Sequence, residues 1–194
     1  MKKTITSTFA IATFCVSAAA VADIYSDAGV ASSLPSVSAE ATENLNTCFQ
    51  SDTQIASSKA IRACSKAYKV SIANYDVRSR ILTRRGLLQL SAGRFDKASR
   101  DFQSAAKLNN ENEFAYLGQG YAALMQKDYA SAAKYFNDCT SHRAAAPLAM
   151  YGLGMAQELR GDTQAAKDSY AEAASMRPDW AAPKTELARI NAAL

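Results

Sequence analysis

The sequence predicts an all-α fold, an α–α superhelix of stacked helical hairpins, on two observations. The 194-residue chain is rich in alanine and has only 8 glycines and 4 prolines, a composition that favours helix over sheet. Small and aromatic residues also recur every 34 residues, the length of one helical hairpin with its turns. One hairpin cannot bury its apolar face alone, whereas about three stacked copies can.

Residues 1–22 have the pattern of a secretory signal peptide. Two lysines precede an uncharged, mostly apolar stretch, and Ala20-Val21-Ala22 forms an A-x-A cleavage site. The apolar stretch is short for a membrane span, which needs ~20 residues, so we expect cleavage; an uncleaved anchor is the alternative. Removal of Lys2 and Lys3 lowers the net charge from +4 to +2, and no dense basic stripe indicates nucleic acid binding.

Residues 23–38 are rich in Ser, Ala and Val and contain Gly29 and Pro35. This composition predicts a flexible arm. Apolar side chains such as Ile24 and Leu34 would allow the arm to dock on the rest of the protein.

The main repeat region begins near residue 77 and rests on several independent columns. Three columns carry it: Gly86, Gly120 and Gly154; Ala98, Ala132 and Ala166; and Phe102, Phe136 and Tyr170. Small residues on both helices of a hairpin let the two backbones approach, and the aromatic residue lies one turn after the alanine on the same face. The columns predict units at 79–112, 113–146 and 147–180, with helices at 79–92, 95–108, 113–126, 129–142, 147–160 and 163–176.

The array is expected to end with a capping helix. Pro178 stops the last repeat helix, and residues 181–194 follow with one apolar stripe of Leu187, Ile190 and Leu194. The region from 77 to 194 therefore reads as a repeat array with its cap.

These columns resemble the tetratricopeptide repeat (TPR), whose pattern runs W-x2-L-G-x2-Y, then A-x3-F, then A, then P. The glycine, alanine and aromatic columns and Pro178 match the pattern. The family tryptophan is replaced by Leu82, Tyr116 and Met150, and its leucine survives only as Leu153. The resemblance implies a TPR solenoid that binds other proteins and carries no cofactor.

Residues 39–76 read as a degenerate N-terminal hairpin. Counting back 34 residues places Cys64 in the alanine column and Asp52 in the glycine column, so the first helix is expected to be short or irregular. Cys48 and Cys64 would then lie on the two arms of this hairpin. The segment resembles exported TPR proteins of Gram-negative bacteria, in which a Cys pair precedes the repeats; this implies a Cys48–Cys64 disulfide and the periplasm, with two buried free thiols as the alternative.

No arrangement of residues predicts catalysis or a metal site. His142 is the only histidine, so neither a histidine-based catalytic group nor a histidine metal cluster can form. Cys139 stands in a small-residue column and is expected to be a buried core thiol. The cluster of Arg78, Arg80, Arg84 and Arg85 is expected to form a solvated helix face.

The resemblance also implies a partner-binding groove lined by the first helix of each unit. The period assigns its lining to Arg80, Thr83, Leu87, Leu90, Phe114, Leu117, Tyr121, Leu124, Met125, Leu148, Tyr151 and Met155. Most of these side chains are apolar or aromatic, and an exposed apolar patch of this size marks a contact site.

We therefore expect a non-enzymatic interaction adaptor that binds an apolar peptide or helix of another protein. Two other occupants of the groove stay open: the chain's own arm at 23–38, and a second copy of the chain in a homodimer. A carrier or chaperone-like protein that shields a hydrophobic ligand is the alternative function.

Overall fold

The computed structural model describes residues 38–51, 57–71, 74–142 and 144–192. The predicted signal peptide and all of the predicted arm except Ser38 lie outside these residues. The described chain is helical: α2 (Ala39–Gln50), α3 (Ser58–Val70), α4 (Tyr75–Ser91), α5 (Phe95–Leu108), α6 (Glu113–Met125), α7 (Tyr129–Cys139), α8 (Ala146–Arg160), α9 (Thr163–Met176) and α10 (Ala181–Ala192).

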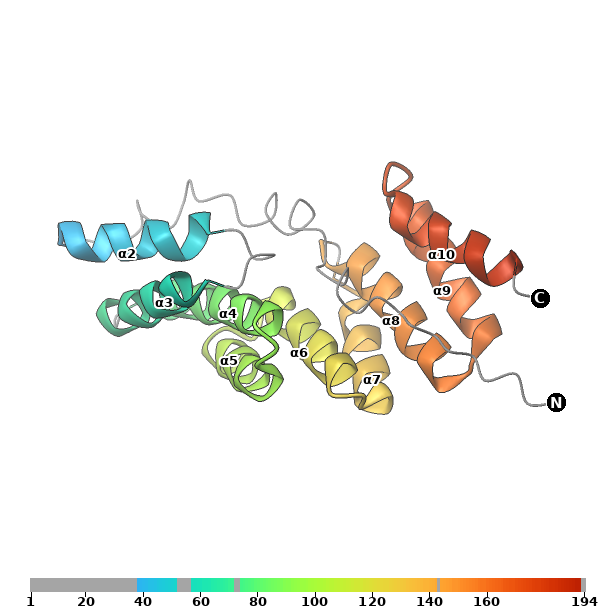
Figure 1. Ribbon diagram of the computed structural model, residues 1–194, viewed down its shortest axis with the longest axis horizontal. Helices are drawn as coiled ribbons and strands as arrows, with labels where there is room; N and C mark the ends of the chain where they lie inside the picture. The colour runs from blue at the N-terminus through green and yellow to red at the C-terminus, as the bar shows by residue number, and fades with distance from the viewer. Residues whose placement is uncertain (1–37, 52–56, 72–73, 143, 193–194) are drawn as a thin grey trace.

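Successive helices pair as hairpins that stack along the long axis of the molecule (Figure 1). The all-α prediction is confirmed, and the six predicted repeat helices match α4 to α9 closely. The largest difference at a start is α4, which begins at Tyr75 because the Asn74 side chain accepts a hydrogen bond from the backbone N–H of Val77 and caps the helix there. No described helix is long and apolar enough to cross a lipid bilayer.

The turn within each repeat hairpin has the same backbone geometry in all three copies. Gly93, Lys127 and Gly161 are spaced by 34 residues and have φ angles of 68°, 64° and 92°. This left-handed conformation closes the C-terminal end of the first helix and reverses the chain into the second helix. Lys127 holds it without the conformational freedom of glycine.

Each aromatic residue of the repeat column lies between glycines of two helices. A Cβ atom added to Gly86 on α4 or to Gly118 on α6 would lie only 2.6 or 2.4 Å from the Phe102 ring. Phe136 is held in the same way between Gly120 and Gly152. The glycines therefore let α4, α6 and α8 close on the two rings, which join each hairpin to the next.

This arrangement changes at the C-terminal end. The ring of Tyr170 lies against Gly154 of α8, but the residue 34 positions after Gly152 is Glu186 of α10. Helix α10 covers the last hairpin with Ile190 buried in the same apolar cluster as Tyr170.

The N-terminal hairpin of α2 and α3 carries the Cys48–Cys64 disulfide, as predicted. Both cysteines are buried, and Cys139 is a buried free thiol. The first helix of this hairpin, α2, has 12 residues and ends at Gln50, before the position of the missing glycine.

Candidate partner-binding surface

The residues predicted to line the groove lie on the first helices of the hairpins, α4, α6 and α8. Arg80, Leu87, Leu90, Phe114 and Met125 are half-buried, whereas Thr83, Leu117, Tyr121, Leu124, Leu148, Tyr151 and Met155 are buried. These side chains are less exposed than an open trough would leave them. Most of the buried ones belong to one apolar cluster that continues to Ile190 of α10. Their role in partner binding remains a prediction.

The two tyrosines among these residues are held by neighbouring aromatic rings. The ring of Tyr121 meets Phe136 edge to face, with centroids 4.9 Å apart, and its hydroxyl donates to the carbonyl of Leu148 at 3.4 Å. Burial raises the pKa of Tyr121 above its ordinary value. Tyr151 packs against Tyr170 and Trp180, at 5.5 and 4.9 Å between ring centroids. Both rings are therefore fixed in position rather than free to turn toward solvent.

A polar network that the sequence did not reveal fixes the register of α4 and α6. Asn112 caps α6 and donates through its side-chain amide to Ser79 at 2.7 Å and to Thr83 at 3.0 Å. Ser79 in turn donates to the carbonyl of Ala105 at 2.8 Å. Thr83 is therefore part of a buried network, in which each hydroxyl is satisfied and costs little to bury.

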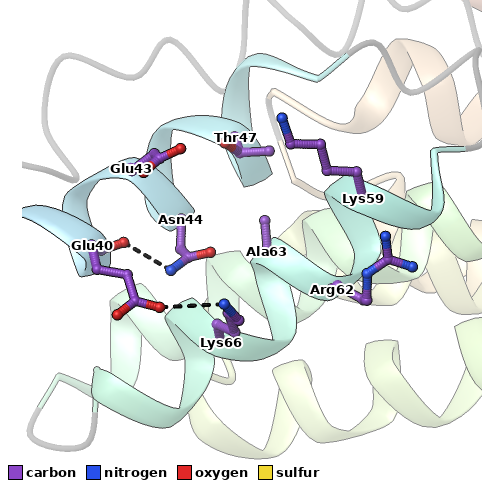
Figure 2. Close-up of a pocket in the computed structure, with 8 residues that line it drawn as sticks. All are labelled: Glu40, Glu43, Asn44, Thr47, Lys59, Arg62, Ala63 and Lys66. Atoms are coloured by element: carbon purple, nitrogen blue, oxygen red, sulfur yellow. Dashed lines mark hydrogen bonds and ion pairs between the residues drawn. The ribbon is translucent and has the colours of Figure 1, made fainter.

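A hollow of about 260 Å³ lies between α2 and α3 (Figure 2), and none of the residues predicted to line the groove borders it. Glu40 and Glu43 of α2 line one side, and Lys59, Arg62 and Lys66 of α3 line the other. The Glu40–Lys66 ion pair crosses the hollow at 3.3 Å, but both side chains are more than half exposed. An exposed pair of this kind contributes little to stability. No three His, Cys, Asp or Glu side chains among the described residues are grouped to hold a metal ion.

Two stretches of the chain, residues 83–140 and 148–179, match models of the tetratricopeptide repeat. Both stretches are therefore tetratricopeptide repeats. The resemblance inferred from the glycine, alanine and aromatic columns is confirmed over these residues, which carry the three regular TPR hairpins. No curated protein matches the sequence.

Solved structures share the TPR fold. MamA 41-end from Desulfovibrio magneticus RS-1 has a TM-score of 0.63 and 17% identity, over 81% of this chain and 86% of that chain. Two further MamA structures have TM-scores of 0.62 and 0.60 at 19% identity, covering 78% and 76% of this chain and 80% and 81% of theirs. Similarity at this level of identity concerns the fold alone.

The arginines of α4 correct one expectation, because Arg84 and Arg85 are not on a solvated face. Arg84 is only 5% exposed and donates to the carbonyls of Cys48 at 3.2 Å, Phe49 at 2.8 Å and Ser51. These are carbonyls at the C-terminal end of α2, where a positive charge is favourable.

Arg85 occupies the TPR leucine position and pairs with a buried acid. Its guanidinium donates to both carboxylate oxygens of Asp101, at 2.7 and 2.6 Å, and to the hydroxyl of Ser65 at 3.0 Å. The hydrogen bonds to Asp101 raise the pKa of Arg85 above its ordinary value. Gln89 also donates to Asp101 at 2.7 Å, so the departure from leucine is compensated by a paired, hydrogen-bonded charge.

At the last TPR hairpin the aromatic column becomes polar. The hydroxyl of Tyr170 donates to Glu158 at 3.1 Å, and Arg189 of α10 donates to Glu158 at 2.5 Å and to Glu186 at 2.6 Å. These groups form a charged network where the earlier hairpins have a phenylalanine between two glycines. The surface of α4, α6 and α8 is thus bordered by arginines at one end and by this network at the other.

Proposed function

We propose that this protein is a non-enzymatic interaction scaffold that binds an apolar peptide or helix of a partner protein on the surface formed by α4, α6 and α8. The tetratricopeptide repeats support the first part, because stacked helical hairpins of this kind typically mediate protein–protein contacts. One observation supports the second part: Leu87 and Leu90 of α4 and Met125 of α6 each keep part of their surface exposed. Apolar side chains at such spacing suit the apolar face of an incoming helix.

We further propose that the protein is exported to the periplasm of a Gram-negative bacterium. The pattern of residues 1–22 and the Cys48–Cys64 disulfide both support an oxidising compartment. Fractionation of cells that express the full chain, followed by N-terminal sequencing, tests this. We expect a periplasmic protein that begins at Asp23, and an uncleaved protein in the cytoplasmic fraction would contradict it.

A matched pair of methionines tests the binding surface. Met125 is the last residue of α6 and half-buried on the proposed surface, whereas Met176 is the last residue of α9 and 39% exposed elsewhere. Crosslinking in the cell envelope, with mass-spectrometric identification, would compare Met125→Glu and Met176→Glu with the unaltered protein. A charge in an apolar contact costs about 2 kcal/mol or more, so Met125→Glu should lower partner recovery by at least about tenfold.

Met176→Glu should leave recovery unchanged, and circular dichroism would check that both variants remain folded. Equal recovery with both variants would contradict the proposed surface. Two further measurements address the other occupants: light scattering would reveal a homodimer, and native mass spectrometry would reveal a co-purified lipid. Binding of the chain's own arm at 23–38 would appear as increased partner recovery when the arm is deleted.

A further inference from the structure

The hairpin of α2 and α3 lacks the ring-and-glycine contact of the later hairpins. The buried face of α3 consists of small side chains, Ala60, Ala63, Cys64 and Ala67. The large apolar side chains that α2 buries are Leu45 and Phe49. The Cys48–Cys64 bond therefore supplies a covalent link across an interface with few large side chains.

Hydrogen bonds from Arg84 of α4 form a second link to α2, and one of them involves Cys48 itself. The buried guanidinium of Arg84 donates to the carbonyl of Cys48, and also to those of Phe49 and Ser51. If α2 moves away, Arg84 loses these three hydrogen bonds, and hydrogen bonds from a charged group are costly to break. The disulfide thus ties the C-terminal end of α2 to α3, and Arg84 ties the same end to α4.

This end of α2 borders the proposed binding surface. Arg80 is the first of the residues predicted to line the groove. Its guanidinium carbon lies 5.9 Å from the centroid of the Phe49 ring. Leu45 and Phe49 share one apolar cluster with Ile81 and Leu88 of α4. Movement of α2 would therefore expose apolar side chains of α4 and remove Phe49 from beside Arg80.

We propose that the Cys48–Cys64 disulfide is a redox lock on α2. While it is closed, α2 forms the N-terminal wall of the binding surface; when a dithiol reductant opens it, α2 separates from α3 and α4 and the rest of the stack stays folded. The effect on partner binding rests on the proposed function, whereas the release of α2 does not.

The opening reaction is a thiol–disulfide exchange. A thiolate of the reductant attacks one protein sulfur, forms a mixed disulfide and displaces the other sulfur as a thiolate. The second thiolate of the reductant then displaces the remaining protein sulfur. The reductant leaves as its own disulfide, and the two protons that its thiols released are taken up by Cys48 and Cys64. Both sulfurs are fully buried, so the reductant reaches them during brief local fluctuations of the hairpin, and the lasting release of α2 follows the reduction.

Hydrogen–deuterium exchange on the full chain tests the lock without a partner. The comparison is between the oxidised protein, the same protein reduced with dithiothreitol, and Cys48→Ala/Cys64→Ala. Cys139→Ala is the matched control, because it removes a buried sulfur that forms no disulfide. We expect the amides of α2 to lose protection by roughly tenfold or more in the reduced protein and in the double variant, while those of α6 to α9 change less than about twofold.

Two results would overturn the proposal. If α2 keeps its protection in the double variant, Arg84 and the apolar contacts hold the helix without the disulfide. If all helices lose protection together, the disulfide stabilises the whole protein and is not a local lock. Partner crosslinking with the same variants would be read separately: release of α2 without any change in recovery would separate the lock from the proposed binding surface.

Discussion

The N-terminal hairpin and the regular hairpins after it follow the same chain path but are joined to their neighbours by different chemistry. Between α4, α6 and α8, a phenylalanine ring fits between two glycines, so contact depends on shape and on apolar burial. Between α2, α3 and α4, an apolar cluster without a ring-and-glycine contact is reinforced by a disulfide, by hydrogen bonds from Arg84 to helix carbonyls, and by the hydrogen bond from Arg85 to Ser65. A repeat geometry can thus be kept when its packing residues are lost, provided that directed polar or covalent bonds replace them.

The largest effect is expected from a substitution that breaks the apolar contact between two regular hairpins. Phe136 is fully buried between Gly120 and Gly152, so Phe136→Ala should lower the free energy of unfolding by about 3–5 kcal/mol. Urea unfolding followed by circular dichroism measures it. Tyr135→Ala, one position away and only half-buried, is the control and should cost clearly less. Similar losses for both would show that the ring-and-glycine contact is not what joins these hairpins.

A smaller loss of stability is expected at the polar junction, the hydrogen bonds between Arg84 of α4 and the end of α2. Arg84→Met keeps an unbranched side chain but removes the donors to the α2 carbonyls, which should lower the free energy of unfolding by about 2 kcal/mol. The loss should appear first as faster amide exchange in α2. Arg100→Met, on the exposed side of α5, should change stability by less than about 0.5 kcal/mol. An Arg84→Met protein as stable as this control would remove the basis for the polar junction.

Gly118→Ala tests whether the regular hairpins depend on the close approach of a glycine to an aromatic ring. Alanine gains about 1 kcal/mol in helix propensity over glycine. Its Cβ would lie 2.4 Å from the Phe102 ring, which Gly86 blocks on the other side, and overpacking of this kind costs about 1–3 kcal/mol. We expect a net loss of about 1 kcal/mol. Adding Phe102→Leu should relieve the clash, so additive losses in a double-mutant cycle would argue against close approach.

The smallest effect concerns the cysteine of the regular hairpins. Burial raises the pKa of Cys139 to about 12, from 9.0 for an unperturbed thiol. Between these values the unfolded chain releases the proton while the folded chain keeps it, so this group lowers stability as pH rises from 9. At pH 9.5 the unaltered protein should lose up to about 1 kcal/mol more, relative to pH 7, than Cys139→Ala does. Equal losses in the two proteins would show that the thiol is not shielded from water.

The fold could be predicted from sequence because its packing residues repeat. The glycine, alanine and aromatic columns specify where two backbones approach, and the same 34-residue step located all six repeat helices. The Cys48–Cys64 pairing followed from the family resemblance, with both residues in columns on opposite arms of one hairpin. The burial of the predicted groove lining could not be predicted, because the period places side chains on a helix face but does not specify how deeply neighbouring groups bury them.

The polar contacts were missed because they depend on residues that occur once. Arg84 stands where the later repeats have Gly118 and Gly152, and only the position of the α2 carbonyls explains it. The pairing of Arg85 with Asp101 could have been predicted from the sequence, because the two residues are opposite charges in the inward-facing columns of one hairpin. A charged residue in such a column indicates a buried pair rather than a solvated face.

The replacement of a glycine by Glu186 has a consequence for how long this protein can become. An additional hairpin placed after residue 180 would meet a carboxylate where it needs space for a ring, and would displace the bridge from Arg189 to Glu158. A copy of residues 113–146 inserted in the middle would instead meet the same phenylalanine and glycines on both sides. We therefore expect an added hairpin to be tolerated better in the middle of this array than before α10.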